Sequence, residues 1–115
     1  MTIPQAHTKP RVLVTSAAGR TAAPAVLDLL KKGFPVRAFV RRDDARAAAL
    51  RKAGAEIFVG NLLDLRDLRQ ALVDVQRAYY CPPLSPNNLH GSVLFALAVE
   101  EAKLETVALL SQWNP

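Results

Sequence analysis

The sequence predicts an α/β fold, a three-layer doubly wound parallel sheet of five strands in the order 3-2-1-4-5. Short apolar, β-branched runs alternate along the chain with segments whose apolar residues recur at helical spacing. The connections between them are only a few residues long. The chain has 115 residues, of which 50% are hydrophobic and 22% are charged, as is typical of one folded domain. Such alternation requires right-handed crossovers between parallel strands, with helices on both faces of the sheet.

The first strand–helix–strand unit has the clearest signals. The run Arg11–Thr15 predicts a buried strand, and Ser16–Gly19 predicts a tight turn. A helix is expected from Arg20 to Lys32, with Gly33 ending it just past its C-terminus. The second strand follows at Pro35–Val40.

The rest of the chain repeats this alternation. Asp43 or Asp44 is expected to cap the second helix and Asp64 the third, because a carboxylate accepts hydrogen bonds from the free N–H groups of a first helical turn. The expected elements are a helix ending at about Ala53, a strand Glu56–Val59, a helix from Asp64 with the apolar face Leu65, Leu68 and Leu72, a strand Gln76–Cys81, a helix from about Asn88 to Lys103 carrying Val93, Leu94, Leu97 and Ala98, and a strand Thr106–Leu110.

Positive charge is concentrated in the first half of the chain. Residues 1–57 hold 11 basic and 4 acidic side chains, a balance of +7. Residues 58–115 hold 4 basic and 6 acidic side chains, a balance of −2. This asymmetry indicates an anionic ligand on the first half.

Composition excludes several classes of protein. The single cysteine, Cys81, rules out an internal disulfide framework and a zinc site built from cysteines, and with only His7 and His90 beside it we expect no metal site. No stretch is long and apolar enough to cross a membrane, and residues 1–10 lack the apolar core of a secretory signal. We therefore expect a cytoplasmic protein with a flexible tail over residues 1–10 and one domain over residues 11–115.

The loop after the first strand is the first candidate for ligand binding, because ligands of such sheets lie beyond the carboxyl ends of the strands where strand order reverses. Ser16, Ala18 and Gly19 are small, so the backbone can approach a ligand closely. Free N–H groups and the positive end of a helix dipole can hold a phosphate there, and Arg20 and Thr21 add side-chain donors. We predict nucleotide binding; the alternative is a tight turn whose small residues serve only packing.

The loop after the second strand favours NADP(H) over NAD(H). Folds of this kind that prefer NAD place an acid about 20 residues past the glycines, where it binds the ribose 2′-hydroxyl. Val40 and Arg41 occupy that position here, followed by Arg42. A guanidinium pairs with a 2′-phosphate, whereas a carboxylate would repel it. The alternative is that both arginines are solvated charges that pair with Asp43 and Asp44.

Two further loops complete the candidate cofactor-binding residues. Asn61, after the third strand, can hydrogen-bond the edge of an adenine, and Leu62 can pack on its face. Pro82 follows the fourth strand at the expected reversal of strand order. Helix capping explains Asp64 better than ligand binding does.

Residues Arg11–Pro115 resemble the N-terminal half of the NmrA-like family, an atypical branch of the short-chain dehydrogenase/reductase superfamily with a Rossmann fold. The family motif T-G-A-T-G-x-x-G is similar to the segment Thr15-Ser-Ala-Ala-Gly-Arg-Thr-Ala22, and V-R after the second strand is similar to Val40-Arg41. The motif G-D-x-x-D-x-x-S-L is similar to Gly60-Asn-Leu-Leu-Asp-Leu-Arg-Asp-Leu68. Ser16 and Ala22 replace the first and third glycines, and Ser16 fits only if its φ angle suits a residue with a side chain.

The resemblance implies NAD(P)(H) binding, usually with a bias to NADP(H), and a substrate pocket built largely by a C-terminal region. The family includes quinone reductases and non-enzymatic regulators that sense the redox state of the cofactor. We therefore expect the NADP(H)-binding domain of an NAD(P)H-dependent oxidoreductase of the quinone-reductase kind. The alternative is a redox-sensing regulator that binds NAD(P) and a partner protein.

No catalytic residue is assigned from the sequence. Superfamily reductases often use Y-x-x-x-K, but Pro83 and Leu84 stand four residues after Tyr79 and Tyr80. Nucleic-acid binding is not expected, because the basic half lacks aromatic platforms and longer basic runs. A sheet that stops at the fifth strand has an open edge, through which an oligomer could form. We therefore expect a truncated, cofactor-binding half of a protein whose substrate the sequence does not name.

Overall fold

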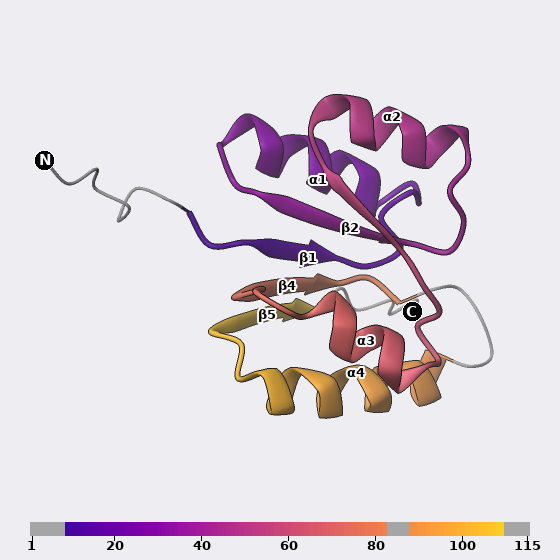
Figure 1. Ribbon diagram of the computed structural model, residues 1–115, viewed down its shortest axis with the longest axis vertical. Coiled ribbons are helices and arrows are strands. Elements are labelled where there is room, and N and C mark those ends of the chain that lie inside the picture. The colour runs from indigo at the N-terminus through magenta and orange to yellow at the C-terminus, as the bar shows by residue number, and fades with distance from the viewer. Residues whose placement is uncertain (1–8, 83–87, 110–115) are drawn as a thin grey trace, which may run out of the picture.

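The computed structural model describes residues 9–82 and 88–109 as a parallel sheet between two layers of helices (Figure 1). The five strands are parallel and lie in the order β3-β2-β1-β4-β5, which confirms the predicted fold class and strand order. Along the chain the elements are β1 (Val12–Val14), α1 (Ala22–Lys31), β2 (Val36–Val40), α2 (Ala45–Ala53), β3 (Glu56–Val59), α3 (Leu65–Ala71), β4 (Arg77–Tyr80), α4 (Asn88–Ala102) and β5 (Thr106–Leu109).

The sheet is buried on both faces. Helices α1 and α2 cover one face, and α3 and α4 cover the other (Figure 1). Successive residues of a strand point to opposite faces, so Val12 and Val14 join the core under α1 and α2, whereas Leu13 joins the core under α3 and α4. The central strand β1 is therefore apolar throughout, as a strand of a parallel sheet must be.

Carboxylates and glycines set the ends of the helices as expected. Asp44, rather than Asp43, caps α2 by accepting hydrogen bonds from the N–H groups of Arg46 (3.0 Å) and Ala47 (3.2 Å). Asp64 caps α3 by accepting from the N–H of Arg66 at 2.9 Å. Gly54 ends α2 with a φ of 116°, a left-handed angle that glycine adopts without steric cost.

Several element ends differ from the expected ones. Helix α1 begins at Ala22 instead of Arg20, because the chain from Thr15 to Thr21 forms turns first. The buried residues of α4 also differ from the expected apolar set. Phe95 and Ala98 are buried, while Val93 and Leu97 remain about half exposed. Residues 1–8 of the predicted tail over residues 1–10, and residues 110–115 with the predicted last strand residue Leu110, lie outside the described residues. None of the helices in the described ranges is long and apolar enough to cross a membrane.

The amino end of β2 carries a buried arginine that was not expected from the residue pattern. Arg37 is only 9% exposed, and its Nη1 donates to the carbonyl oxygens of Ala71 and Val73, both at 2.7 Å. Its Nε lies 3.1 Å from a carboxylate oxygen of Glu56 on β3. A cation thus sits on the carbonyls at the end of α3, where the helix dipole is negative, and ties that helix to the sheet.

Candidate functional site

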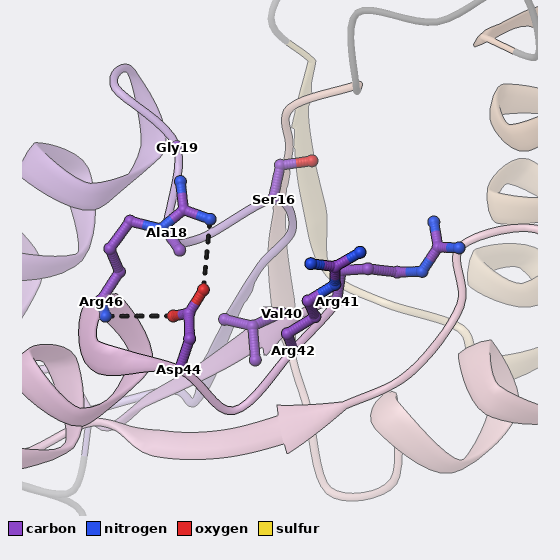
Figure 2. A pocket seen from close by; sticks show the side chains of 8 residues that line it. All are labelled: Ser16, Ala18, Gly19, Val40, Arg41, Arg42, Asp44 and Arg46. Atoms are coloured by element: carbon purple, nitrogen blue, oxygen red, sulfur yellow. Dashed lines mark hydrogen bonds and ion pairs between the residues drawn. The ribbon is translucent and has the colours of Figure 1, made fainter.

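A pocket of about 440 Å³ opens where the loops after β1 and β2 meet, at the carboxyl ends of these strands (Figure 2). This volume lies within the range of pockets that bind small molecules and cofactors. Five of the residues proposed from the sequence line it together. The lining consists of Ser16, Ala18, Gly19, Val40, Arg41, Arg42, Asp44 and Arg46.

The loop after β1 is a tight turn that requires small residues. The N–H of Gly19 donates to the carbonyl of Ser16 at 2.9 Å, and the N–H of Ala17 donates to the carbonyl of Phe39 at 3.1 Å. A β-carbon on Gly19 would lie 3.1 Å from the Ser16 carbonyl oxygen, a tighter contact than such atoms normally make. Ser16 itself has a φ of 50°, so a serine holds the left-handed conformation usual for glycine.

The end of this loop presents unpaired donors ahead of α1. Arg20 and Thr21 are exposed, and their side chains do not line the pocket. Among the residues that the structure describes, their backbone N–H groups donate no hydrogen bond. They stand at the positive end of the α1 dipole, which is a position where anions bind.

The two aspartates after Arg42 do not neutralise the arginines before them. Asp43 pairs with Arg51 at 3.0 Å, and Asp44 pairs with Arg46 at 3.3 Å. The pairing of Asp43 and Asp44 with Arg41 and Arg42, one part of the alternative raised by the sequence, is therefore wrong, whereas both arginines are exposed as its other part expects. Both acids are turned toward α2 instead, because Asp44 caps that helix and Arg51 lies further along it.

A census of the arginines separates this edge of the sheet from the rest of the molecule. Of the ten arginines, seven lie within ion-pair distance of an acid; these are Arg11, Arg37, Arg46, Arg51, Arg66, Arg69 and Arg77. Arg20, Arg41 and Arg42 have no such partner within residues 9–82 and 88–109, and the segments outside these ranges contain no Asp or Glu. All three follow the carboxyl ends of β1 and β2, so uncompensated arginine charge gathers there.

Arg46 is a pocket residue that was missing from the sequence-based set. Figure 2 shows its guanidinium above Asp44 and beside Ala18, with Arg41 and Arg42 extending on the other side of Val40. The signal was available, since side chains of a helix point back toward its N-terminus. A residue in the first turn of α2, two positions after the cap, therefore reaches the loops at this edge.

The remaining proposed residues do not line this pocket. The Asn61 side-chain oxygen accepts from the N–H of Leu63 at 2.9 Å, and the Asn61 N–H donates to the Asp67 carboxylate at 2.9 Å. Leu62 packs against the core under α3 and α4. Pro82 is buried just after β4. In the structure these loop residues serve the loop's own hydrogen bonds and packing.

The point where strand order reverses, between β1 and β4, is closed by a side chain. The Thr15 hydroxyl donates to the carbonyl of Cys81 at 3.1 Å and accepts from the Cys81 N–H at 2.8 Å. Burial raises the pKa of the Cys81 thiol, which keeps it protonated and unreactive at neutral pH. Cys81 is thus a buried packing residue directly after β4.

Comparison with known proteins finds similarity both in sequence and in fold. A 68-residue segment of the chain is 44% identical to sterol demethylase protein B of Methylococcus capsulatus, covering 59% of this chain and 20% of that protein. The NADPH-dependent quinone oxidoreductase QOR2 of Escherichia coli, solved with NADPH, is similar with a TM-score of 0.75 and 22% identity over 85% of this chain and 35% of that one.

A third protein, similar in structure, is named for a different reaction, epimerisation. The UDP-glucose 4-epimerase of Bifidobacterium longum, solved with NAD+ and UDP, is similar with a TM-score of 0.77 and 16% identity over 88% of this chain and 36% of that chain. At these identities the two solved structures show the fold alone. The sequence model of the NmrA-like family matches residues 8–106, which include both strands and both loops of the pocket. The chain therefore belongs to the NmrA-like family.

Proposed function

We propose that this chain binds NADP(H) in the pocket beyond β1 and β2. The observation that carries the proposal is the group of arginines without acidic partners, of which Arg41 and Arg42 line the pocket. In this proposal Arg41 and Arg42 hold the 2′-phosphate. The pyrophosphate is held by the loop after β1, through Ser16, Ala18 and Gly19 and through Arg20 and Thr21 that follow them. Asn61, Leu62 and Pro82 remain proposed contacts for the rest of the cofactor.

The charges in the pocket support NADP(H) over NAD(H). An NAD-preferring site needs a free carboxylate for the ribose hydroxyls. Among the described residues that line the pocket, Asp44 is the only acid, and its carboxylate already accepts from two backbone N–H groups and the Arg46 guanidinium. The free charges are therefore guanidinium groups, which match a phosphate dianion.

The test is calorimetric titration of the purified chain with NADPH and NADH. We expect NADPH to bind at least about tenfold more tightly, because the 2′-phosphate adds charge-assisted hydrogen bonds to arginine. Substituting Arg41→Glu should remove this preference, since it places a negative charge beside the 2′-phosphate.

Arg66→Glu is the matched control for that substitution. Arg66 is an exposed arginine in the first turn of α3 and does not line the pocket, and an acid is favourable at this helix position. The control should keep the preference for NADPH. Equal affinity of the unmodified chain for both dinucleotides would contradict the proposed preference, and binding of neither would contradict the function.

For the whole protein we propose an NAD(P)H-dependent oxidoreductase acting in the cytoplasm, with a quinone as the substrate class. The bound cofactor supplies hydride transfer, and this chain's residues bind and orient it. A sterol is the second substrate class, because the Methylococcus relative is named as a sterol demethylase protein. NADPH oxidation followed by absorbance, with a quinone and with a keto-sterol, separates the two. A redox-sensing regulator would bind the cofactor and oxidise it with neither.

A further inference from the structure

One carboxylate lies among the arginines of the pocket, and it holds one of them. Asp44 and Arg46 both line the pocket, and the Arg46 Nη2 donates to the Asp44 Oδ2 at 3.3 Å (Figure 2). Arg41 and Arg42, on the other side of Val40, have no such partner. Three guanidinium groups line the pocket. An anionic ligand that binds Arg46 must therefore compete with the Asp44 carboxylate, whereas one that binds Arg41 or Arg42 has no acidic competitor among the described residues.

Asp44 performs two separable tasks with its two oxygens. Oδ1 accepts from the N–H groups of Arg46 and Ala47 and so caps α2, whereas Oδ2 accepts from the Arg46 guanidinium. The backbone hydrogen bond from Ala47 is the largest of the effects that lower the pKa of Asp44, so the carboxylate is charged at neutral pH. An asparagine can perform the first task with its amide oxygen but carries no charge for the second.

We propose that Asp44 is a specificity-determining residue that weakens 2′-phosphate binding by withholding Arg46 from the ligand. This inference rests on the proposed function, because it assumes that a 2′-phosphate occupies the pocket. The Asp44 and Arg46 side chains are 37% and 70% exposed, so their ion pair is screened and exchangeable. A phosphate that recruits Arg46 must break this pair and leave the Asp44 charge facing it. Asp44 thereby sets how strongly the site prefers NADP(H) over NAD(H).

The test is the Asp44→Asn variant, titrated with adenosine 2′-monophosphate, NADPH and NADH. The amide oxygen keeps the cap, while the amide NH₂ repels the guanidinium and releases Arg46. We expect adenosine 2′-monophosphate and NADPH to bind about fivefold more tightly, as befits one exchangeable ion pair, and NADH affinity to change less than twofold. Thermal unfolding of the variant checks that α2 is still capped.

Two further variants isolate the cause. Asp43→Asn makes the same change of net charge one residue away, but Asp43 pairs with Arg51 and does not line the pocket, so affinity should stay within twofold. In Asp44→Asn combined with Arg46→Gln, the fivefold gain should disappear, because the released guanidinium is gone.

The outcomes separate this inference from the proposed function. If the unmodified chain binds neither NADPH nor adenosine 2′-monophosphate, the proposed function fails. If it binds them and Asp44→Asn brings no gain, or the gain survives the loss of Arg46, the site stands and the withholding of Arg46 is refuted.

Discussion

Ser16 holds a backbone conformation that its side chain does not favour. Its φ of 50° lies in the left-handed region, where the β-carbon of an ordinary residue approaches the carbonyl oxygen that follows it. The turn enforces this angle, because the Ser16 carbonyl accepts the Gly19 N–H at 2.9 Å and the next N–H, of Ala17, is held by Phe39. The proposed cofactor loop thus contains a local strain that a glycine would relieve.

We expect Ser16→Gly to stabilise the fold by about 0.5–1 kcal/mol. The left-handed conformation costs a residue with a β-carbon about 1–2 kcal/mol, which the glycine would save. Glycine also loses more backbone freedom on folding, which lowers the free energy of unfolding by about 0.5–1 kcal/mol and so offsets part of this gain. Urea unfolding measures the difference. Ser92→Gly, the same substitution within α4, should instead lower stability, and a loss of stability at both positions would show that Ser16 is not strained.

At the level of single residues, the positions of two pocket arginines could be predicted from the sequence, but the residues that each arginine contacts could not. Arg41 and Arg42 could be placed in the pocket because they directly follow a predicted strand at its carboxyl end. Arg46 was missed although its place in the first turn of α2 could have indicated it, whereas Arg37 could not be placed, because its role depends on where a long side chain folds in three dimensions. The same holds for the φ of Ser16, which the neighbouring hydrogen bonds impose.

Among the helices, the caps differ in a way that the sequence only partly distinguishes. Asp44 and Asp64 accept N–H groups of their own first turns, whereas Thr21 precedes α1 without any side-chain cap bond. The Arg20 and Thr21 N–H groups ahead of α1 donate no hydrogen bond within the described residues, whereas the Asp44 and Asp64 side chains accept N–H groups of α2 and α3. Of the three helices whose caps the structure describes, α1 is the one without an acid at its cap.

We expect Asp64→Ala to destabilise the protein by about 1 kcal/mol, because α3 loses its cap. Asp64→Asn should cost much less, since an amide oxygen still accepts the Arg66 N–H. Thr21→Ala should change stability little, as no cap bond is lost there. Thermal or urea unfolding of the three variants checks the order, and an equal loss for Asn and Ala would point to the ion pair with Arg66 instead.

The buried face of a helix was predictable where its apolar residues form a single stripe. The Leu65, Leu68 and Leu72 face of α3 packs on the sheet as expected, because one apolar stripe leaves a short helix no other orientation. Helix α4 is apolar on several sides, so its sequence does not state which side is buried. Packing selects Phe95, which stacks on Tyr80 with ring centroids 4.5 Å apart, and leaves Leu89, Val93 and Leu97 exposed.

Over the whole molecule, part of the positive charge of the first half of the chain lies at the pocket, where Arg41, Arg42 and Arg46 are among the lining residues. Residues 1–57 carry the +7 balance and build α1, α2 and both pocket loops. The strand order was predictable because alternating strands and helices with short connections leave few topologies open. The pairing of each acid was not, since it depends on contacts between segments distant in the sequence, such as Arg69 with Glu101.

This arrangement predicts that ligand affinity depends strongly on ionic strength. Raising NaCl from about 0.05 M to about 0.5 M should weaken binding of adenosine 2′-monophosphate about tenfold, because it shortens the screening length to a few ångströms. Adenosine, which lacks the phosphate, should show almost no salt dependence. Titrations at several salt concentrations test this, and equal behaviour of the two ligands would argue against arginine recognition of the phosphate.

Because Arg37 is ion-paired, the arginine charges at the two ends of β2 differ in whether an acid neutralises them. Three arginines belong to β2 and the two residues after it, but the one at the amino end is folded inward onto carbonyls and Glu56, while Arg41 and Arg42 at the other end face the solvent. The strand thus runs from a neutralised end to a positive end. We expect the unpaired guanidinium groups at the carboxyl end to raise the rate at which an anionic ligand binds as well as its affinity, since charges of opposite sign attract before contact.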